Sequence, residues 1–126
     1  MLAYAILAIY LRMFTRDELN LIRPGLDYGW PAISYGIEYS GEPIGPGETA
    51  REGMEQPVYY WDPVIAPSGM AFYHAAAIPE WQGSLFIGAL AGQHISRLVL
   101  EGGRVMYEER LLSEVSQRFR DIMSHP

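Results

Sequence analysis

The chain has 126 residues, a length that suits one ordinary domain or a piece of a larger one, and with 49% apolar and 19% charged residues it is neither disordered nor a coiled coil. A formal charge of -6 provides no basic surface for phosphate groups, so nucleic acid is not expected as a partner. The absence of cysteine excludes disulfides, thiolate metal sites and cysteine nucleophiles.

Residues 1–11 form an apolar run that ends at Arg12. The run is too short to span a membrane, so no membrane association is expected. A secretory signal has basic residues before its apolar core, whereas here the first basic residue follows it. We therefore expect either a buried strand or a translation start inside an older, longer gene.

Beyond Thr15, glycine and proline recur so closely that helices of ordinary length do not fit between them. The segments between these breakers have the length and residue types of strands, most distinctly at 69–73, 85–90, 95–100 and 104–112. Residues 41–54 are rich in Gly, Pro and Glu and are expected to form a long exposed loop. The predicted fold class is all-β.

The clearest local element is a hairpin. The strands 95–100 and 105–109 flank Gly102-Gly103, and two glycines supply the positive φ angles of a tight turn. Segment 85–90 is apolar on both faces, as a strand buried between neighbours should be, and Gly88 within it permits close backbone approach. These three strands predict a meander.

Four-stranded meanders arranged radially make a β-propeller. Trp30, Trp61 and Trp81 each lie beside a turn and would suit packing between propeller blades. A β-sandwich would contain similar strands, and no exact internal repeat distinguishes the two architectures.

A cluster of oxygen ligands occurs near the start of the chain, where Asp17, Glu18 and Asn20 lie within four positions. Calcium accepts carboxylate and carbonyl oxygens from irregular loops, which makes a calcium site one interpretation. The other is structural: Thr15 and Glu18 have the spacing of a capping box and would begin a helical turn that Pro24 stops. The residues alone favour the cap, which is the more general signature.

Two arginines stand near the C-terminal end. In an extended chain Arg118 and Arg120 share a face, and two guanidinium forks side by side suit a ligand that bears several carboxylates. The alternative is a solvated surface on which Asp121 pairs locally with an arginine, a contact of little energy.

The middle of the chain is rich in aromatic residues that suit stacking on a planar cofactor or a sugar ring, although such residues are more often core: Tyr35, Tyr39, Tyr59, Tyr60 and Trp61. The spacing of the histidines does not indicate metal ligation, and no role is assigned to His74, His94 or His125.

Several motifs, in order and at similar spacing, resemble those of the pyrroloquinoline quinone (PQQ) dependent aldose sugar and soluble glucose dehydrogenases. They are 17–20 (DELN), 28–31 (YGWP), 35–41 (YGIEYSG), 56–61 (QPVYYW), 66–73 (APSGMAFY), 85–90 (LFIGAL) and 117–121 (QRFRD). The resemblance extends from Asp17 to Asp121, and an ordered series of motifs is far more specific than any one of them.

The resemblance implies about two to three blades of a six-bladed β-propeller, whose top face binds PQQ and calcium and oxidises the anomeric carbon of aldoses. PQQ carries three carboxylates, which suits the arginine pair. Carried over position by position, the implied site residues are Glu18 and Tyr28 for calcium, and Tyr39, Ala89, Arg118 and Arg120 for PQQ.

The chain departs from the family's pattern in several places. In the family a histidine abstracts the sugar hydroxyl proton, but no histidine here lies in the matching context, so no catalytic residue is expected. Ser116 stands where glycine is usual, and residues 74–77 replace a more polar turn. Residues 1–14 are unlike the family, whereas 15–126 are expected to form a partial dehydrogenase domain that is truncated at both ends.

The expected function is therefore PQQ-dependent oxidation of an aldose, in a chain that holds half of the cofactor site and is inactive alone. The missing N-terminal blades, or another copy of the chain, would complete it. The family resemblance implies a periplasmic location, although the chain shows no convincing signal peptide. The alternative function is a non-catalytic β module that binds carbohydrate or a protein partner through its aromatic loops.

Overall fold

The structure is a computed structural model that describes residues 3–7, 17–29, 32–33, 42 and 46–125. Within these residues it contains strands and two short 3-10 helices but no α-helix, so the chain is all-β as predicted. The chain divides into two compact units, Met1–Val64 and Ile65–Pro126. Each unit has its own sheet and is described by itself.

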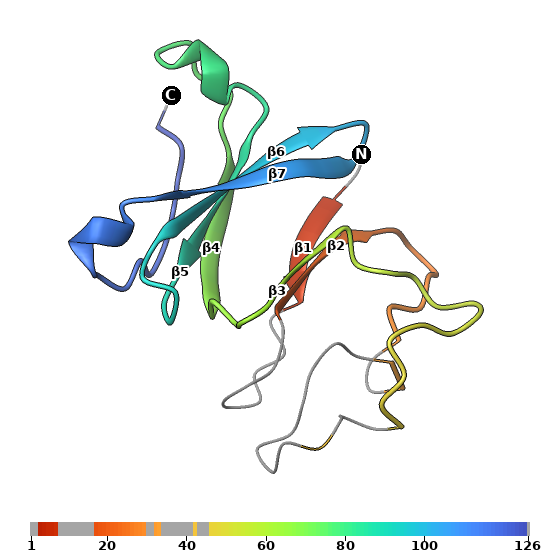
Figure 1. Cartoon of the computed structure of the whole chain (residues 1–126). Helices are drawn as coiled ribbons and strands as arrows, with labels where there is room; N and C mark the ends of the chain where they lie inside the picture. The colour runs from red at the N-terminus through yellow and green to blue at the C-terminus, as the bar shows by residue number, and fades with distance from the viewer. Residues whose placement is uncertain (1–2, 8–16, 30–31, 34–41, 43–45, 126) are drawn as a thin grey trace. The chain divides into compact units, whose positions relative to one another are not determined.

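The first unit contains a three-stranded antiparallel sheet in the order β1-β2-β3 (Figure 1). Its strands are β1 (Ala3–Leu7), β2 (Asp17–Ile22) and β3 (Tyr59–Trp61). The apolar run at the start of the chain thus contains a strand, which is part of one of the two expectations for it. Leu19 and Trp61 are 0% and 1% exposed and form the core of this sheet.

The capped helical turn predicted around Glu18 is wrong, because residues 17–22 form β2. Strand β2 is central in its sheet, and Glu18 pairs in register with Leu7 of β1 and Tyr60 of β3. Backbone partners on both sides satisfy the hydrogen-bonding groups that a lone helical turn would leave open, which overrides the local capping signal.

Most of the described part of the loop at 41–54 is exposed, as predicted. Glu42 and residues 46–53 are exposed, and only Met54 is half-buried. Glu48 and Arg51 form an exposed ion pair at 2.9 Å, and their hydrogen bond lowers the pKa of the Glu48 carboxyl and raises the pKa of Arg51. An ion pair this exposed adds little to stability.

The second unit is a four-stranded antiparallel meander in the order β4-β5-β6-β7 (Figure 1). Its elements are β4 (Pro67–Phe72), η1 (Pro79–Trp81), β5 (Leu85–Ala89), β6 (Ile95–Glu101), β7 (Arg104–Leu111) and η2 (Ser113–Val115). All five residues of β5 are buried, as expected for a central strand that carries apolar residues on both faces. The predicted meander of three strands is confirmed, and the strand predicted at 69–73 joins it as β4.

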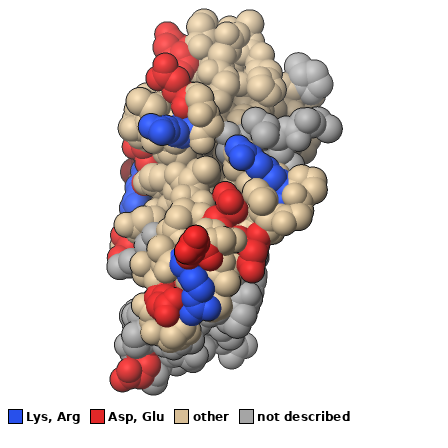
Figure 2. Space-filling view, turned by 90° about the vertical axis from the view of Figure 1, so that its right-hand side faces the viewer, with Lys and Arg blue, Asp and Glu red and all other residues tan. Residues whose placement is uncertain are grey.

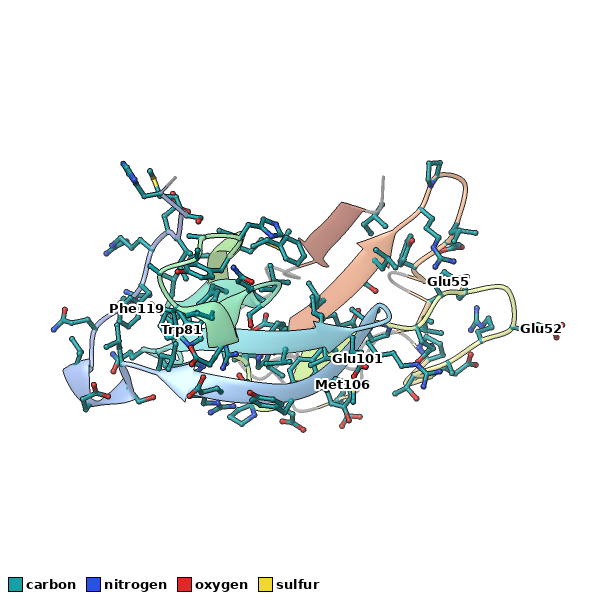
Figure 3. The ribbon with its side chains drawn as sticks, turned by 90° about the horizontal axis from the view of Figure 1, so that it is seen from above. Glu52, Glu55, Trp81, Glu101, Met106 and Phe119 are labelled. Atoms are coloured by element: carbon teal, nitrogen blue, oxygen red, sulfur yellow. The ribbon has the colours of Figure 1, made fainter. Side chains whose placement is uncertain are left out.

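The predicted hairpin is confirmed at β6 and β7, where Glu101 pairs with Arg104 across the turn. Gly102 and Gly103 have φ angles of 57° and 78°, the left-handed region that a two-residue hairpin turn with this twist requires. In Figure 3, Glu101 and Met106 lie at this end of the two strands.

A buried arginine joins η1 to the sheet. Arg97 on β6 is 6% exposed and donates hydrogen bonds to Ser84 Oγ (3.1 Å), to the Glu80 carbonyl (2.6 Å) and to Glu109 Oε2 (2.7 Å). Burial by itself lowers the pKa of Arg97, but hydrogen bonding that includes Glu109 outweighs it and raises the pKa. The Trp81 ring lies 5.9 Å from the guanidinium and 5.0 Å from the Phe86 ring, so this tryptophan packs within its own unit.

Figure 2 shows one face of the molecule, on which acidic and basic side chains are interspersed among uncharged residues. Among the residues that the structure describes, no helix is long and apolar enough to cross a membrane.

Candidate functional site

The C-terminal segment, residues 116–125, docks on the sheet of the second unit at the end of β5. The backbone N–H of Phe119 donates a hydrogen bond of 3.2 Å to the carbonyl oxygen of Ala89. The hydroxyl oxygen of Ser68 on β4 lies 2.7 Å from the Phe119 carbonyl oxygen and 3.1 Å from the Gly88 carbonyl oxygen. Figure 3 shows Phe119 on this segment beside the sheet. Phe119 is thus held through both of its backbone polar groups.

Two glycines allow this close approach. A Cβ atom on Gly88 would lie 2.6 Å from Ser68 Oγ and 3.1 Å from the Phe119 carbonyl oxygen, both too close. A Cβ atom on Gly69 would collide with the Asp121 carboxylate and lie 3.1 Å from the Ile122 nitrogen. The β4–β5 register also shifts between Pro67 and Met70. An irregularity of this kind changes the direction in which the side chains of the segment point, and Ser68 lies in this segment.

Arg118 and Arg120 flank this anchored residue. Both arginines are exposed while Phe119 is half-buried, which is the alternation expected of an extended chain packed on one side. Within the described part of the chain, neither guanidinium has an ion pair or hydrogen bond. Asp121 accepts a hydrogen bond from the Ile122 N–H at 2.9 Å and pairs with neither arginine. The local pair of the alternative interpretation is therefore not formed.

Ala89 links the docked segment to the sheet. It is fully buried, its N–H donates to the His94 carbonyl oxygen at 3.0 Å, and its own carbonyl accepts from Phe119. The structure therefore brings together three of the six residues implied by the family resemblance, Ala89, Arg118 and Arg120. Arg118 and Arg120 share one short segment, whereas Ala89 is 29 positions before Arg118 in the sequence. Ala89 therefore comes near the arginines only because their segment docks on the sheet.

The two residues implied for calcium lie in the first unit. Glu18 is 6% exposed and sits on central strand β2. The Tyr28 hydroxyl donates to the Leu21 carbonyl at 2.7 Å and accepts from the Arg23 N–H at 2.7 Å, so it closes the turn after β2. Tyr39, implied as a PQQ contact, lies outside the described residues.

The described residues provide only some of the oxygen ligands that a calcium ion needs. Calcium takes about six to eight oxygen ligands, and Asp17 and Glu18 are successive strand residues whose side chains leave opposite faces. No group of three or more His, Asp or Glu side chains in the described ranges could hold a metal ion. No step of the chemistry is therefore assigned to calcium.

The arginine pair fits PQQ. Its two exposed guanidinium groups, without partners among the described residues, offer several N–H donors to a ligand with three carboxylates, and the backbone between them is anchored. An anchored backbone lowers the entropy that the arginines lose when they bind.

Sequence reasoning missed Ser68, whose hydroxyl contacts the Phe119 carbonyl oxygen of the docked segment. In the sequence, Pro67-Ser68-Gly69 indicates only a turn. Gly88 was expected to permit close backbone approach, and the approaching backbone is that of Phe119. The histidines remain without a catalytic assignment: His74 and His125 are exposed, and His94 is 2% exposed.

Comparisons with known proteins agree with these features. The family model described as Glucose / Sorbosone dehydrogenase matches residues 14–126. Aldose sugar dehydrogenase YliI of Escherichia coli (strain K12) is 43% identical over 112 residues, which are 87% of this chain and 30% of that protein. The protein slr1608 of Synechocystis is 42% identical over 87% of this chain and 26% of its own length.

Solved structures give the same result. A crystal structure of glucose dehydrogenase has a TM-score of 0.83 and 50% identity, over 88% of this chain and 33% of that one. The PQQ-bound aldose sugar dehydrogenase of Streptomyces coelicolor has a TM-score of 0.63 and 27% identity, over 95% of this chain and 30% of that one. The chain thus spans about a third of the length of these relatives. The fold class predicted as part of a β-propeller is confirmed, and the chain belongs to the glucose / sorbosone dehydrogenase family.

Proposed function

We propose that this chain supplies the arginine side of a PQQ site in an enzyme that oxidises the anomeric carbon of aldose sugars. The observation that carries the proposal is the docking of Phe119 on Ala89 and Ser68, which presents Arg118 and Arg120 side by side. Membership of the glucose / sorbosone dehydrogenase family and similarity to a PQQ-bound aldose sugar dehydrogenase support it.

In this proposal Arg118 and Arg120 bind carboxylates of PQQ through paired, charge-assisted hydrogen bonds. Ala89 is proposed as a further PQQ contact; its side chain is fully buried, and its carbonyl oxygen holds the segment that carries the arginines. Tyr39 is proposed as a further contact. Bound PQQ supplies a quinone that accepts a hydride from the sugar.

No catalytic base is proposed within this chain. The sugar hydroxyl must lose a proton to a group within hydrogen-bond reach, and we propose that this group belongs to a part of the enzyme outside these residues. The relatives are about three times as long as this chain, which supports a catalytic base that lies outside these residues. Either the remaining blades or a second copy would complete the site. The proposed location is the periplasm.

Calcium is proposed as a second component, bound in the first unit by Glu18 and Tyr28. The buried carboxylate of Glu18 provides one hard oxygen ligand. Carbonyl oxygens of the turn after β2 would have to supply others.

Titration of the full chain with PQQ, with and without calcium, tests the proposal. Loss of one charged hydrogen-bonding group costs about 1.5–3 kcal/mol, so Arg118→Ala and Arg120→Ala should each weaken binding by about tenfold or more. The matched control is Arg104→Ala, which removes the same charge from an exposed position on β7.

Equal effects of all three substitutions would contradict the proposal, because they would indicate only a general loss of positive charge. Absence of PQQ binding at any concentration would reject it for this chain. Binding of an aldose without PQQ would favour the alternative function, a non-catalytic carbohydrate-binding module.

A further inference from the structure

His94 is a buried histidine that directly precedes β6, and its backbone is hydrogen-bonded to Ala89, on which the arginine segment docks. The residue is 2% exposed, and its backbone carbonyl accepts the hydrogen bond from the Ala89 N–H at 3.0 Å. Ala89 in turn accepts from the Phe119 N–H. A chain of two backbone hydrogen bonds therefore connects His94 to the segment that carries the two arginines.

The imidazole ring braces the turn between β5 and β6. Its Nδ1 atom lies 2.8 Å from the Gly92 carbonyl oxygen, and because a carbonyl can only accept, Nδ1 carries the hydrogen. The ring also fills the space above Gly92, where a Cβ atom would lie 2.5 Å from the His94 Cε1 atom and 3.2 Å from the Ala89 Cβ atom. Gln93, within this turn, has a φ of 52°, a conformation that needs support from its surroundings.

The other ring nitrogen plays no part in this brace. Nε2 has no hydrogen-bond partner within the described residues and lies 4.0 Å from Glu108 Oε1. Glu108 accepts from the Ser96 hydroxyl at 2.7 Å and pairs with Arg110 at 3.4 Å. The imidazole therefore contacts the turn through its Nδ1–H donor, in addition to the backbone hydrogen bonds that Leu90 donates to Ala66 and that Ala91 and Gly92 donate to Ile65.

We propose that His94 is a positioning residue for PQQ binding. Its Nδ1–H bond to Gly92 holds the β5–β6 turn in the shape that keeps the Ala89 carbonyl aimed at the Phe119 N–H, and so keeps the arginine segment docked. This inference rests on the proposed function for its role in PQQ binding, but its structural part can be measured without PQQ.

Two substitutions of similar shape distinguish the effect of the His94 Nδ1–H donor from the effect of the space that the ring fills. Asn and Leu both branch at Cγ and have similar size, but only Asn places an N–H where His94 has Nδ1. His94→Leu should speed hydrogen exchange of the Phe119 amide by about fivefold relative to the central amides of β6, because one hydrogen bond is worth about that factor. His94→Asn should keep the Phe119 rate within about twofold of the parent.

PQQ affinity should follow the same pattern, with about fivefold weaker binding for His94→Leu and near-parent binding for His94→Asn. Ser96→Ala is the control, since Ser96 is buried on β6 and its hydroxyl donates to the Glu108 carboxylate rather than to the β5–β6 turn, and it should leave the Phe119 amide unchanged.

Equal Phe119 exchange in the Leu and Asn variants would overturn the inference, as would a loss of protection spread evenly over β6. If the parent chain binds no PQQ, the proposed function fails, while amide exchange still decides whether His94 positions the segment. If exchange follows the prediction but PQQ affinity does not change, the role of His94 in binding is rejected.

Discussion

Ser68 and Phe119 are 51 positions apart in the sequence, yet the Ser68 hydroxyl oxygen lies 2.7 Å from the Phe119 carbonyl oxygen. This contact, together with the Phe119–Ala89 hydrogen bond, fixes the backbone between two exposed arginines. The arrangement places flexible, charged side chains on a rigid support, which is how a binding site limits the entropy lost on binding.

Ser68→Ala should loosen the C-terminal segment. The substitution removes the hydroxyl that holds Phe119, and a hydrogen bond of this kind contributes about 1 kcal/mol to the free energy of unfolding. Chemical denaturation should show that loss, and PQQ titration should show weaker binding. Ser113→Ala, at an exposed position in η2, should change neither measurement. Unchanged stability in Ser68→Ala would show that the contact does not hold the segment.

Gly88→Ala should destabilise the chain by about 1–3 kcal/mol, because the new methyl group has no room beside Ser68 and Phe119. The double variant Ser68→Ala with Gly88→Ala removes the hydroxyl that the methyl would strike. Its loss in unfolding free energy should therefore be smaller than the sum of the two single losses. Strict additivity would contradict the close packing of these residues.

Arg97→Met should cost about 3 kcal/mol of unfolding free energy, because it leaves the buried Ser84 hydroxyl and the Glu80 carbonyl without their donor. Glu109→Gln should cost only about 1 kcal/mol, since the Glu109 side chain is 43% exposed and can be solvated by water. Thermal denaturation of both variants checks the order. A larger loss in Glu109→Gln than in Arg97→Met would show that the ion pair, rather than the burial of the guanidinium, matters most.

Gly102→Asn should leave stability nearly unchanged, whereas Gly102→Val should cost about 1–2 kcal/mol. Gly102 has a φ of 57°, which asparagine tolerates in a hairpin turn and a β-branched residue does not. No atom lies within 4 Å of the Cβ position at Gly102, so a difference between the two variants reports backbone strain alone. Similar stabilities for Asn and Val would argue against this turn geometry.

The sequence alone was sufficient for elements whose signals are local. The hairpin of β6 and β7 follows from Gly102-Gly103, and the fully buried strand β5 follows from its apolar run. The family and the arginine pair followed from motifs that are contiguous in the chain. Each of these signals lies within a few positions of the chain, and the family required the order of several such motifs between Asp17 and Asp121.

Two features required the tertiary structure. Segment 17–22 has a local capping signal but becomes β2, because partners from β1 and β3 satisfy its backbone. The docking of Phe119 depends on Ser68, Gly88 and Ala89, which come from distant parts of the chain. The sequence by itself predicted a pair of arginines, Arg118 and Arg120, for a carboxylate-rich cofactor. Only the tertiary structure decided how they are held, because contacts between distant residues leave no periodic or local pattern in the sequence.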